Sequence, residues 1–91
     1  KGLNERIIIS RKQYEKTTEK YTVIVAFDIP QELSHLRKWL RYSLIGLGFE
    51  KFQKSLWIGK IKIPEAFIKD IYDLKLNSHI AIFKVLEEGL L

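Results

Sequence analysis

The spacing of apolar and polar positions in the first half of the chain predicts a strand followed by a helix. Residues 21–29 are apolar at nearly every position and rich in β-branched side chains, which is typical of a strand buried on both faces. Beyond it, apolar residues recur at steps of three and four, the spacing of one helix face. These residues are Leu33, Leu36, Leu40, Leu44 and Leu47. Gly46 and Gly48 then supply the helix stop.

The second half of the chain predicts two strands, a second helix and a last strand. Residues 49–53 and 55–62 are expected to be short strands joined by a tight turn. A proline opens the second helix, over residues 64–74. The buried side of this helix carries Phe67, Ile68, Ile71 and Leu74. Residues 79–87 alternate enough to be a final strand.

This order of elements predicts an α+β fold. Strand, helix, strand, strand, helix, strand is the ferredoxin-like βαββαβ arrangement, a four-stranded antiparallel sheet with two helices on one face. The apolar run at residues 21–29 fits a central strand of that sheet. The other face of the sheet then needs a cover, which we expect from a second copy or a neighbouring domain.

Residues 1–20 differ in composition from the rest of the chain. Residues 5–9 are expected to form a short strand, and residues 10–20 a polar helical connector that packs little, because it is charged nearly all round. We therefore assign residues 1–20 to the tail of an upstream region and its connector, and residues 21–91 to the ferredoxin-like domain. The chain begins at Lys1 and not at Met, so we expect it to be part of a longer protein.

Length, cysteine content and charge limit the classes of function. A chain of 91 residues makes one small domain. No apolar stretch approaches the ~18 residues of a membrane span, and none has the layout of a signal peptide. The absence of cysteine excludes a disulfide framework and a thiolate metal site, and fits a cytoplasmic protein. The net charge of +5 favours nucleic acid as a partner, and no membrane partner is expected.

Asp28 ends the apolar strand and is the first candidate functional residue. It lies beside Pro30, which cannot continue a strand ladder. One interpretation is a helix-capping acid that accepts hydrogen bonds from the free N–H groups of the next helix. The other is an oxygen ligand for a divalent cation. Such an ion wants several oxygens, so two copies of Asp28 would have to meet at a dimer axis. Single acids before helices are commonly caps, which favours the first interpretation.

Basic residues in the middle of the chain are candidates for nucleic-acid binding. They are Arg37, Lys38, Arg41, Lys51, Lys54, Lys60 and Lys62. A cluster of this kind beside Phe52 and Trp57 would suit a phosphate backbone. The alternative is that these are solubilising side chains and that Trp57 packs inward. No Ser-His-Asp or Cys-His signature and no glycine-rich phosphate loop is present, which favours a non-catalytic role without excluding an enzyme.

The stretch VIVAFDIPQELSHLRKWLRYSLIGLGFEKFQKSLWIGK resembles the middle domain of the phenylacetate-repressor (PaaX-like) transcriptional regulators. The shared pattern is an apolar strand ending in FDIP, an Arg-bearing helix closing on LGF, and a hairpin closing on LW. The strand-end aspartate and the Q-x-S hairpin at residues 53–55 also resemble the small CRISPR-associated endonuclease of spacer acquisition, the second Cas protein. The resemblance covers about residues 21–87, and both families have the ferredoxin-like fold.

The two families imply different roles for the same residues. In the regulators this domain follows a winged-helix DNA-binding domain, so residues 1–9 would be the last strands of a wing. In the endonucleases the strand-end aspartate, here Asp28, is the metal-site residue of a homodimer, with one copy from each chain. Phe27 and Pro30 match the regulators' FDIP. Residues 31–33, QEL, stand where the endonucleases usually carry arginines.

Our leading hypothesis is therefore a dimerisation or regulatory module of a PaaX-like DNA-binding regulator, homodimeric and without a cofactor. In it, Asp28 caps the first helix. The alternative is a Mg²⁺-dependent CRISPR-associated endonuclease, or a scaffold subunit of spacer acquisition with an integrase partner, acting on DNA or RNA in antiviral defence. There Asp28 would be catalytic and metal-binding, and Arg37, Arg41 and Lys54 would hold the backbone.

Overall fold

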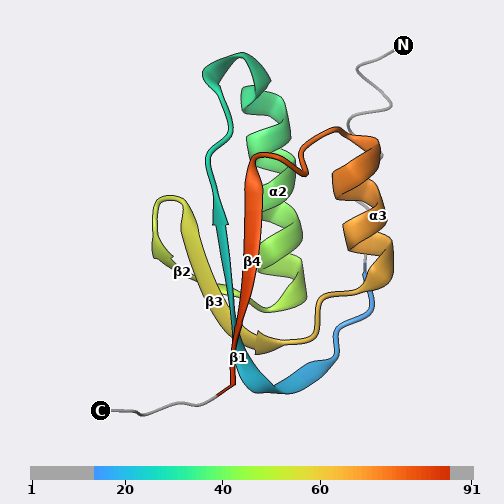
Figure 1. The fold of residues 1–91 in the computed structure, drawn as a ribbon. Coiled ribbons are helices and arrows are strands. Elements are labelled where there is room, and N and C mark those ends of the chain that lie inside the picture. Colours follow the sequence, from blue (N-terminus) through green and yellow to red (C-terminus); the bar gives the residue numbers. More distant parts are fainter. Residues whose placement is uncertain (1–13, 87–91) are drawn as a thin grey trace.

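A computed structural model describes residues 14–86 of the chain. Its elements are β1 (Thr18–Phe27), the 3₁₀ helix η1 (Gln31–Leu33), α2 (Ser34–Leu47), β2 (Glu50–Gln53), β3 (Leu56–Ile61), α3 (Glu65–Asp73) and β4 (Ile80–Val85) (Figure 1). The predicted order of strands and helices is confirmed. The strand expected at residues 5–9 lies outside the described residues.

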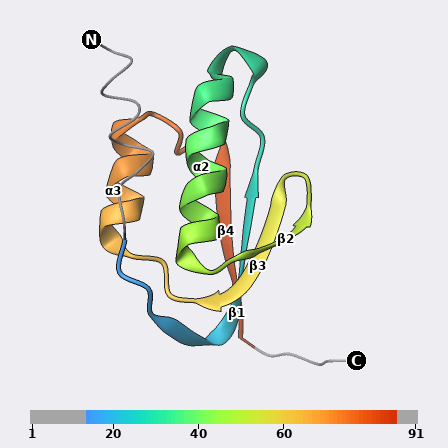
Figure 2. The ribbon, with the colours of Figure 1, turned by 180° about the vertical axis from the view of Figure 1, so that it is seen from behind.

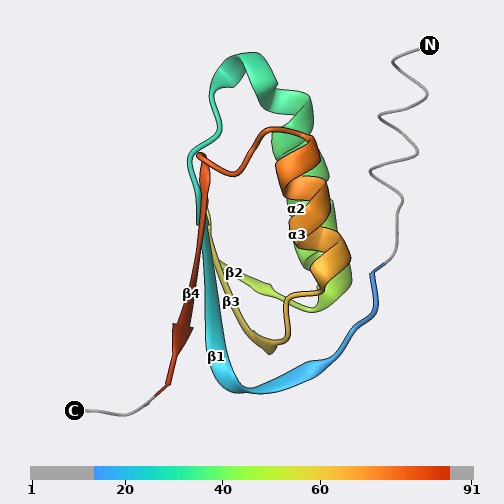
Figure 3. The same ribbon diagram turned by 45° about the vertical axis from the view of Figure 1, so that its right-hand side comes forward.

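The four strands form one sheet in the order β2-β3-β1-β4, and each neighbouring pair is antiparallel. Strand β3 therefore lies between β1 and β2, and β1 lies between β3 and β4. Each helix connects two parallel strands across a strand in between, which is the split βαβ arrangement of the ferredoxin-like fold. Both helices cover the same face, as Figures 2 and 3 show. The predicted fold class is confirmed, with β1 in a central position.

The register of the strands separates a helix-facing side from an open side. On the helix-facing side of β1, Val25 is fully buried and lies opposite Trp57 of β3 and Ile82 of β4. On the open side, the neighbouring Ile24 is half-buried and lies opposite Ile58 and Phe83. The apolar run of β1 thus supplies the core on one side and an apolar surface on the other.

Helix α2 buries its predicted stripe against the sheet. The buried residues of α2 are Leu36, Trp39, Leu40, Ser43, Leu44 and Leu47. Leu33, expected on the same stripe, lies in η1 and is only half-buried. Trp39 is 2% exposed and packs on the fully buried Phe67 of α3, with ring centroids 5.7 Å apart. This aromatic contact joins the two helices above the sheet.

The connector differs from the prediction. Residues 14–17 are irregular and not helical, and β1 begins at Thr18, three residues before the expected start at residue 21. The pairing of β1 with β3 shifts register between Thr18 and Val23, so the first part of the strand follows a different path from the rest. The prediction that the connector packs little holds for residues 15–17, which are exposed, but not for Tyr14, which is half-buried and packs against the core. Residues 10–13 of the expected helix lie outside the described part of the chain.

Two glycines near the end of α2 have different conformations. Gly48 is the C-cap, with φ of 105°, and its N–H donates to the carbonyls of Leu44 and Ile45. Gly46 lies inside the helix, and an added Cβ would meet nothing within 4 Å. Only Gly48 therefore provides the predicted helix stop.

Matched substitutions of these glycines test the helix end. We expect Gly48→Ala to lower the free energy of unfolding by about 1–2 kcal/mol, because a Cβ disfavours the left-handed conformation. Gly46→Ala should raise it by about 0.5–1 kcal/mol, because alanine is the better helix former. Urea unfolding followed by circular dichroism measures both. Equal effects of the same sign would contradict the assignment.

Candidate functional site

Three segments of the chain meet where β1 ends. The N–H of Phe27 donates to the carbonyl of Ser55 in the β2–β3 turn, at 3.1 Å. The N–H of Asp28 donates to the carbonyl of His79, just before β4, at 2.8 Å. Ile29 is 4% exposed and turns its side chain into the core. The backbone of Asp28 is therefore fixed on both sides, and its side chain lies at the surface.

The structure contradicts the helix-capping role of Asp28. The N-cap of η1 is Pro30 and that of α2 is Leu33, and neither helix start has a side-chain cap hydrogen bond. The Asp28 carboxylate is exposed and forms no hydrogen bond or ion pair with another residue of the described range 14–86. The physical reason is that burial of Ile29 and the extended Pro30 separate Asp28 from the first helical turn. The carboxylate is thus available for contacts outside the fold.

Beside Asp28 lies an open hollow of about 250 Å³ that gathers three of the predicted basic residues. Its lining residues are Phe27, Asp28, Ile29, Arg37, Arg41, Lys54 and Ser55. Arg37 and Arg41 stand one turn apart on α2, and both are half-buried. The Nη2 of Arg37 donates to the carbonyl of Ile29 at 2.9 Å, which fixes that guanidinium at the hollow. The hollow therefore combines three cations with one carboxylate.

The other predicted basic residues do not join this hollow. Strand β3 begins opposite Ala26, near the end of β1, and Ile61 pairs with Thr18 at its start. Lys62 therefore lies at the opposite end of the sheet from Lys54. The predicted basic residues that line no part of the hollow are Lys38, Lys51, Lys60 and Lys62. The seven basic residues do not form one patch.

The aromatic residues of the predicted nucleic-acid site also separate. Trp57 is 4% exposed on the helix-facing side, which confirms that it packs inward. Its ring therefore has no exposed face on which a base could stack. Phe52 on β2 is 62% exposed. Stacking on Trp57 is therefore excluded, and the hollow at the end of β1 offers charge and not an aromatic platform.

Asp28 also borders a second, shallower hollow of about 350 Å³. Its lining residues are Ala26, Phe27, Asp28, Ser78, His79, Ile80 and Ala81. Ala26 and Ala81 pair across β1 and β4 and belong to the open side of the sheet. Asp28 thus lies on the ridge between the basic hollow and the open face.

The residues of the basic hollow suit an anion better than a metal ion. Residues 14–86 contain no group of three or more His, Cys, Asp or Glu side chains that could hold a metal. One carboxylate is a poor site for a hard cation, and Arg37, Arg41 and Lys54 would repel it.

In the same residues 14–86, no helix is long and apolar enough to cross a membrane.

Sequence reasoning found part of this site. The sequence predicts a basic cluster that includes Arg37, Arg41 and Lys54, and the structure brings these three residues together. The approach of the β2–β3 turn, which brings Lys54 and Ser55 to Asp28, depends on the pairing of β3 with β1 and has no local signal.

Comparison with known families relates the chain to a described family. The chain matches the family described as "PaaX protein central Cas2-like domain" over residues 10–90. No curated protein and no solved structure gave a significant match.

The exposed carboxylate leads to a stability prediction. We expect Asp28→Ala to change the free energy of unfolding by less than about 0.5 kcal/mol, because no contact within the described fold is lost. The neighbouring Ile29→Ala should cost about 2–5 kcal/mol, because Ile29 is buried. Chemical denaturation of both variants measures the contrast. A loss of about 1 kcal/mol or more in Asp28→Ala would instead indicate a removed cap.

Proposed function

The chain belongs to the family of PaaX central Cas2-like domains, and on this basis we propose that it is the dimer-forming module of a DNA-binding transcriptional regulator. The observation that carries the proposal is the open side of the sheet. Among residues 14–86, nothing covers this side (Figure 3). Apolar side chains on an uncovered sheet face are a mark of an interaction surface.

The open face has an apolar centre that the strand register defines. Ile58, Ile24 and Phe83 form one row across β3, β1 and β4. The next row is Leu56, Ala26 and Ala81. Phe83 is 54% exposed, although it is a large apolar side chain. We call these two rows the open apolar face.

A second copy of the chain is the occupant that fits this face. On β3, β1 and β4 the two rows contain no charged side chain, while Glu50 of β2 continues the first row beside Ile58 at its edge. The apolar centre itself therefore favours an apolar partner. Around a two-fold axis the same patch meets itself, and apolar rows then bury apolar rows. Two-fold dimers are also the commonest assemblies of soluble chains.

Substitution on the open apolar face tests the dimer. We expect the parent chain to be a dimer, and Phe83→Lys to weaken it at least tenfold, because two buried charges would face each other across the axis. The control is Tyr72→Lys, at an exposed position on α3, which should leave the dimer intact. Sedimentation equilibrium measures the dissociation constants. A parent chain that is monomeric at tens of micromolar, or a dimer that Phe83→Lys leaves unchanged, would contradict the proposal.

We further propose that the basic hollow contacts the phosphate backbone of nucleic acid. Arg37, Arg41 and Lys54 come from two segments and converge on one hollow. The hydrogen bond from Arg37 to the carbonyl of Ile29 fixes one of these cations in advance, which reduces the entropy lost on binding. Three cations against one carboxylate leave a surplus of positive charge for a phosphate.

Salt dependence tests this contact. We expect Arg41→Gln and Lys54→Gln each to weaken binding to duplex DNA and to reduce the slope of log affinity against log salt by about 1, because one phosphate contact is lost. Lys38→Gln, on the same helix but outside the hollow, is the matched control. Fluorescence anisotropy over a series of salt concentrations measures the slopes. If all three substitutions reduced the affinity and the slope equally, the hollow would contribute no more to DNA binding than other basic residues of the surface.

A cleavage assay on the parent chain and on Asp28→Ala tests the alternative, a Mg²⁺-dependent endonuclease. The single carboxylate of one chain does not fit a divalent cation, so that activity requires two Asp28 side chains from two copies. Asp28 does border the open apolar face, where a second copy would lie. We expect no metal-dependent cleavage of DNA or RNA by the parent chain. Cleavage that requires Mg²⁺ and is lost in Asp28→Ala would favour the endonuclease.

A further inference from the structure

Tyr14 attaches the connector to the helical layer. Its hydroxyl donates a hydrogen bond to Oδ2 of Asp70 on α3, at 2.6 Å. Its ring packs edge-on against Phe67, with centroids 5.1 Å apart and planes at 64°. Burial first, and then the contact with Asp70, raise the pKa of Tyr14 well above its usual range. The contact pairs a charged acceptor with a partly buried donor, which is the stronger class of hydrogen bond.

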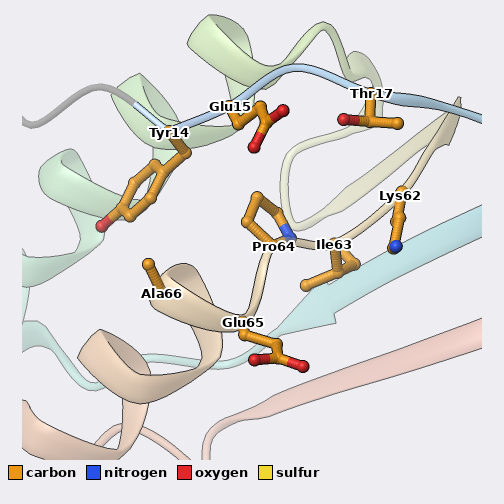
Figure 4. A pocket seen from close by; sticks show the side chains of 8 residues that line it. All are labelled: Tyr14, Glu15, Thr17, Lys62, Ile63, Pro64, Glu65 and Ala66. Carbon is orange, nitrogen blue, oxygen red and sulfur yellow. The ribbon is translucent and has the colours of Figure 1, made fainter.

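The connector has a second attachment three residues later. The carbonyl of Thr17 accepts a hydrogen bond from the N–H of Lys62, at 2.8 Å. Between the two attachments, the connector spans a hollow of about 410 Å³. In Figure 4, Tyr14, Glu15 and Thr17 lie on one side of this hollow and residues 62–66 on the other. Residues 14–17 are therefore a strap that is anchored at both ends.

The strap lies on the helical side of the molecule. Figure 3 shows residues 14–17 beyond the helices, away from the sheet, and Figure 2 shows them beside the lower end of α3. The open apolar face is on the opposite side of the sheet. Core packing through Phe67 and Trp39 stands between the two surfaces.

We propose that the contact between Tyr14 and Asp70 is a latch that fixes the side from which the chain before residue 14 leaves the domain. The consequence for assembly rests on the proposed dimer. When two open apolar faces meet, residues 14–17 of each chain lie on an outer helical surface, on the opposite side of the sheet from the interface. Opening of the latch releases residues 14–16 and weakens the Thr17 attachment while the sheet stays formed, so the point at which the preceding chain leaves the domain can change without dissociation of the dimer.

Hydrogen exchange of single backbone amides tests the latch. Tyr14→Phe keeps the ring and removes the hydroxyl. We expect the Lys62 amide, which binds the strap, to exchange about tenfold faster, because the strap opens more often when its first attachment is weakened. The amides that join β1 to β3 and β4 should keep their rates. Tyr72→Phe, an exposed tyrosine on the same helix as Asp70, is the matched control and should change neither.

Two results would overturn the latch. One is an unchanged Lys62 amide in Tyr14→Phe. The other is a uniform increase at all amides, which would show that Tyr14 supports global stability and does not hold the strap locally. Asp70→Asn gives a second variant, expected to accelerate the same amide because a neutral acceptor binds the hydroxyl less strongly.

The experiment also separates the latch from the dimer. Repeated in the Phe83→Lys background, it should give the same acceleration at Lys62, because the latch lies within one chain. If the dimer proposal is wrong, only the sedimentation result contradicts it. If the latch proposal is wrong, only the hydrogen-exchange result contradicts it. An acceleration that vanishes with Phe83→Lys would overturn a latch within one chain.

Discussion

The pairing of β1 with a strand on each side organises both candidate surfaces of this domain. Because β3 and β4 take their register from β1, side chains of all three strands fall into rows that face either the helices or the open side. The row around Val25 forms the floor of the core, and the row around Ile24 forms the open apolar face. The same pairing ends at Phe27, where β3 and β4 begin, and so brings the β2–β3 turn and His79 to Asp28. The candidate site and the proposed interface therefore both depend on the register of β1 with its two neighbours.

Periodicity was enough to predict the fold, because each element carries its own apolar spacing. The two helices and four strands follow from steps of three and four or from alternation, and the split βαβ order leaves few ways to join them. The packing of the connector could not be predicted in this way, because a single tyrosine in a polar segment has no periodicity. Its partner Asp70 is 56 residues away, and that distance in sequence leaves no local signal. Tyr14 shows that one side chain can attach a segment whose average composition predicts that it packs little.

The role of Asp28 shows where local sequence rules stop. An acid two residues before a proline and a helix has the composition of a cap, but capping requires the side chain to reach the first free N–H groups. Burial of Ile29 turns the backbone and leaves Pro30 in the cap position. The carboxylate then lies among Arg37, Arg41 and Lys54 without an ion pair to any of them. At an exposed site such charges are largely screened, so the fold gains little from this arrangement and the charges stay available for a ligand.

The strap and the open apolar face lie on opposite sides of one core. A surface that forms a dimer benefits from rigidity, because side chains that are already ordered lose less entropy on association. A connector benefits from flexibility, since a segment with few attachments can open locally while the global fold is intact. In residues 14–17, the contacts that hold the strap include hydrogen bonds to Asp70 of α3 and to Lys62 and an aromatic contact with Phe67. In the sheet, by contrast, β1 is paired on both sides and its helix-facing side lies on a buried core. In the proposed dimer, this difference in local stability would let a weak input at the connector open the proposed latch, whereas the open apolar face would respond only to changes that disturb the core.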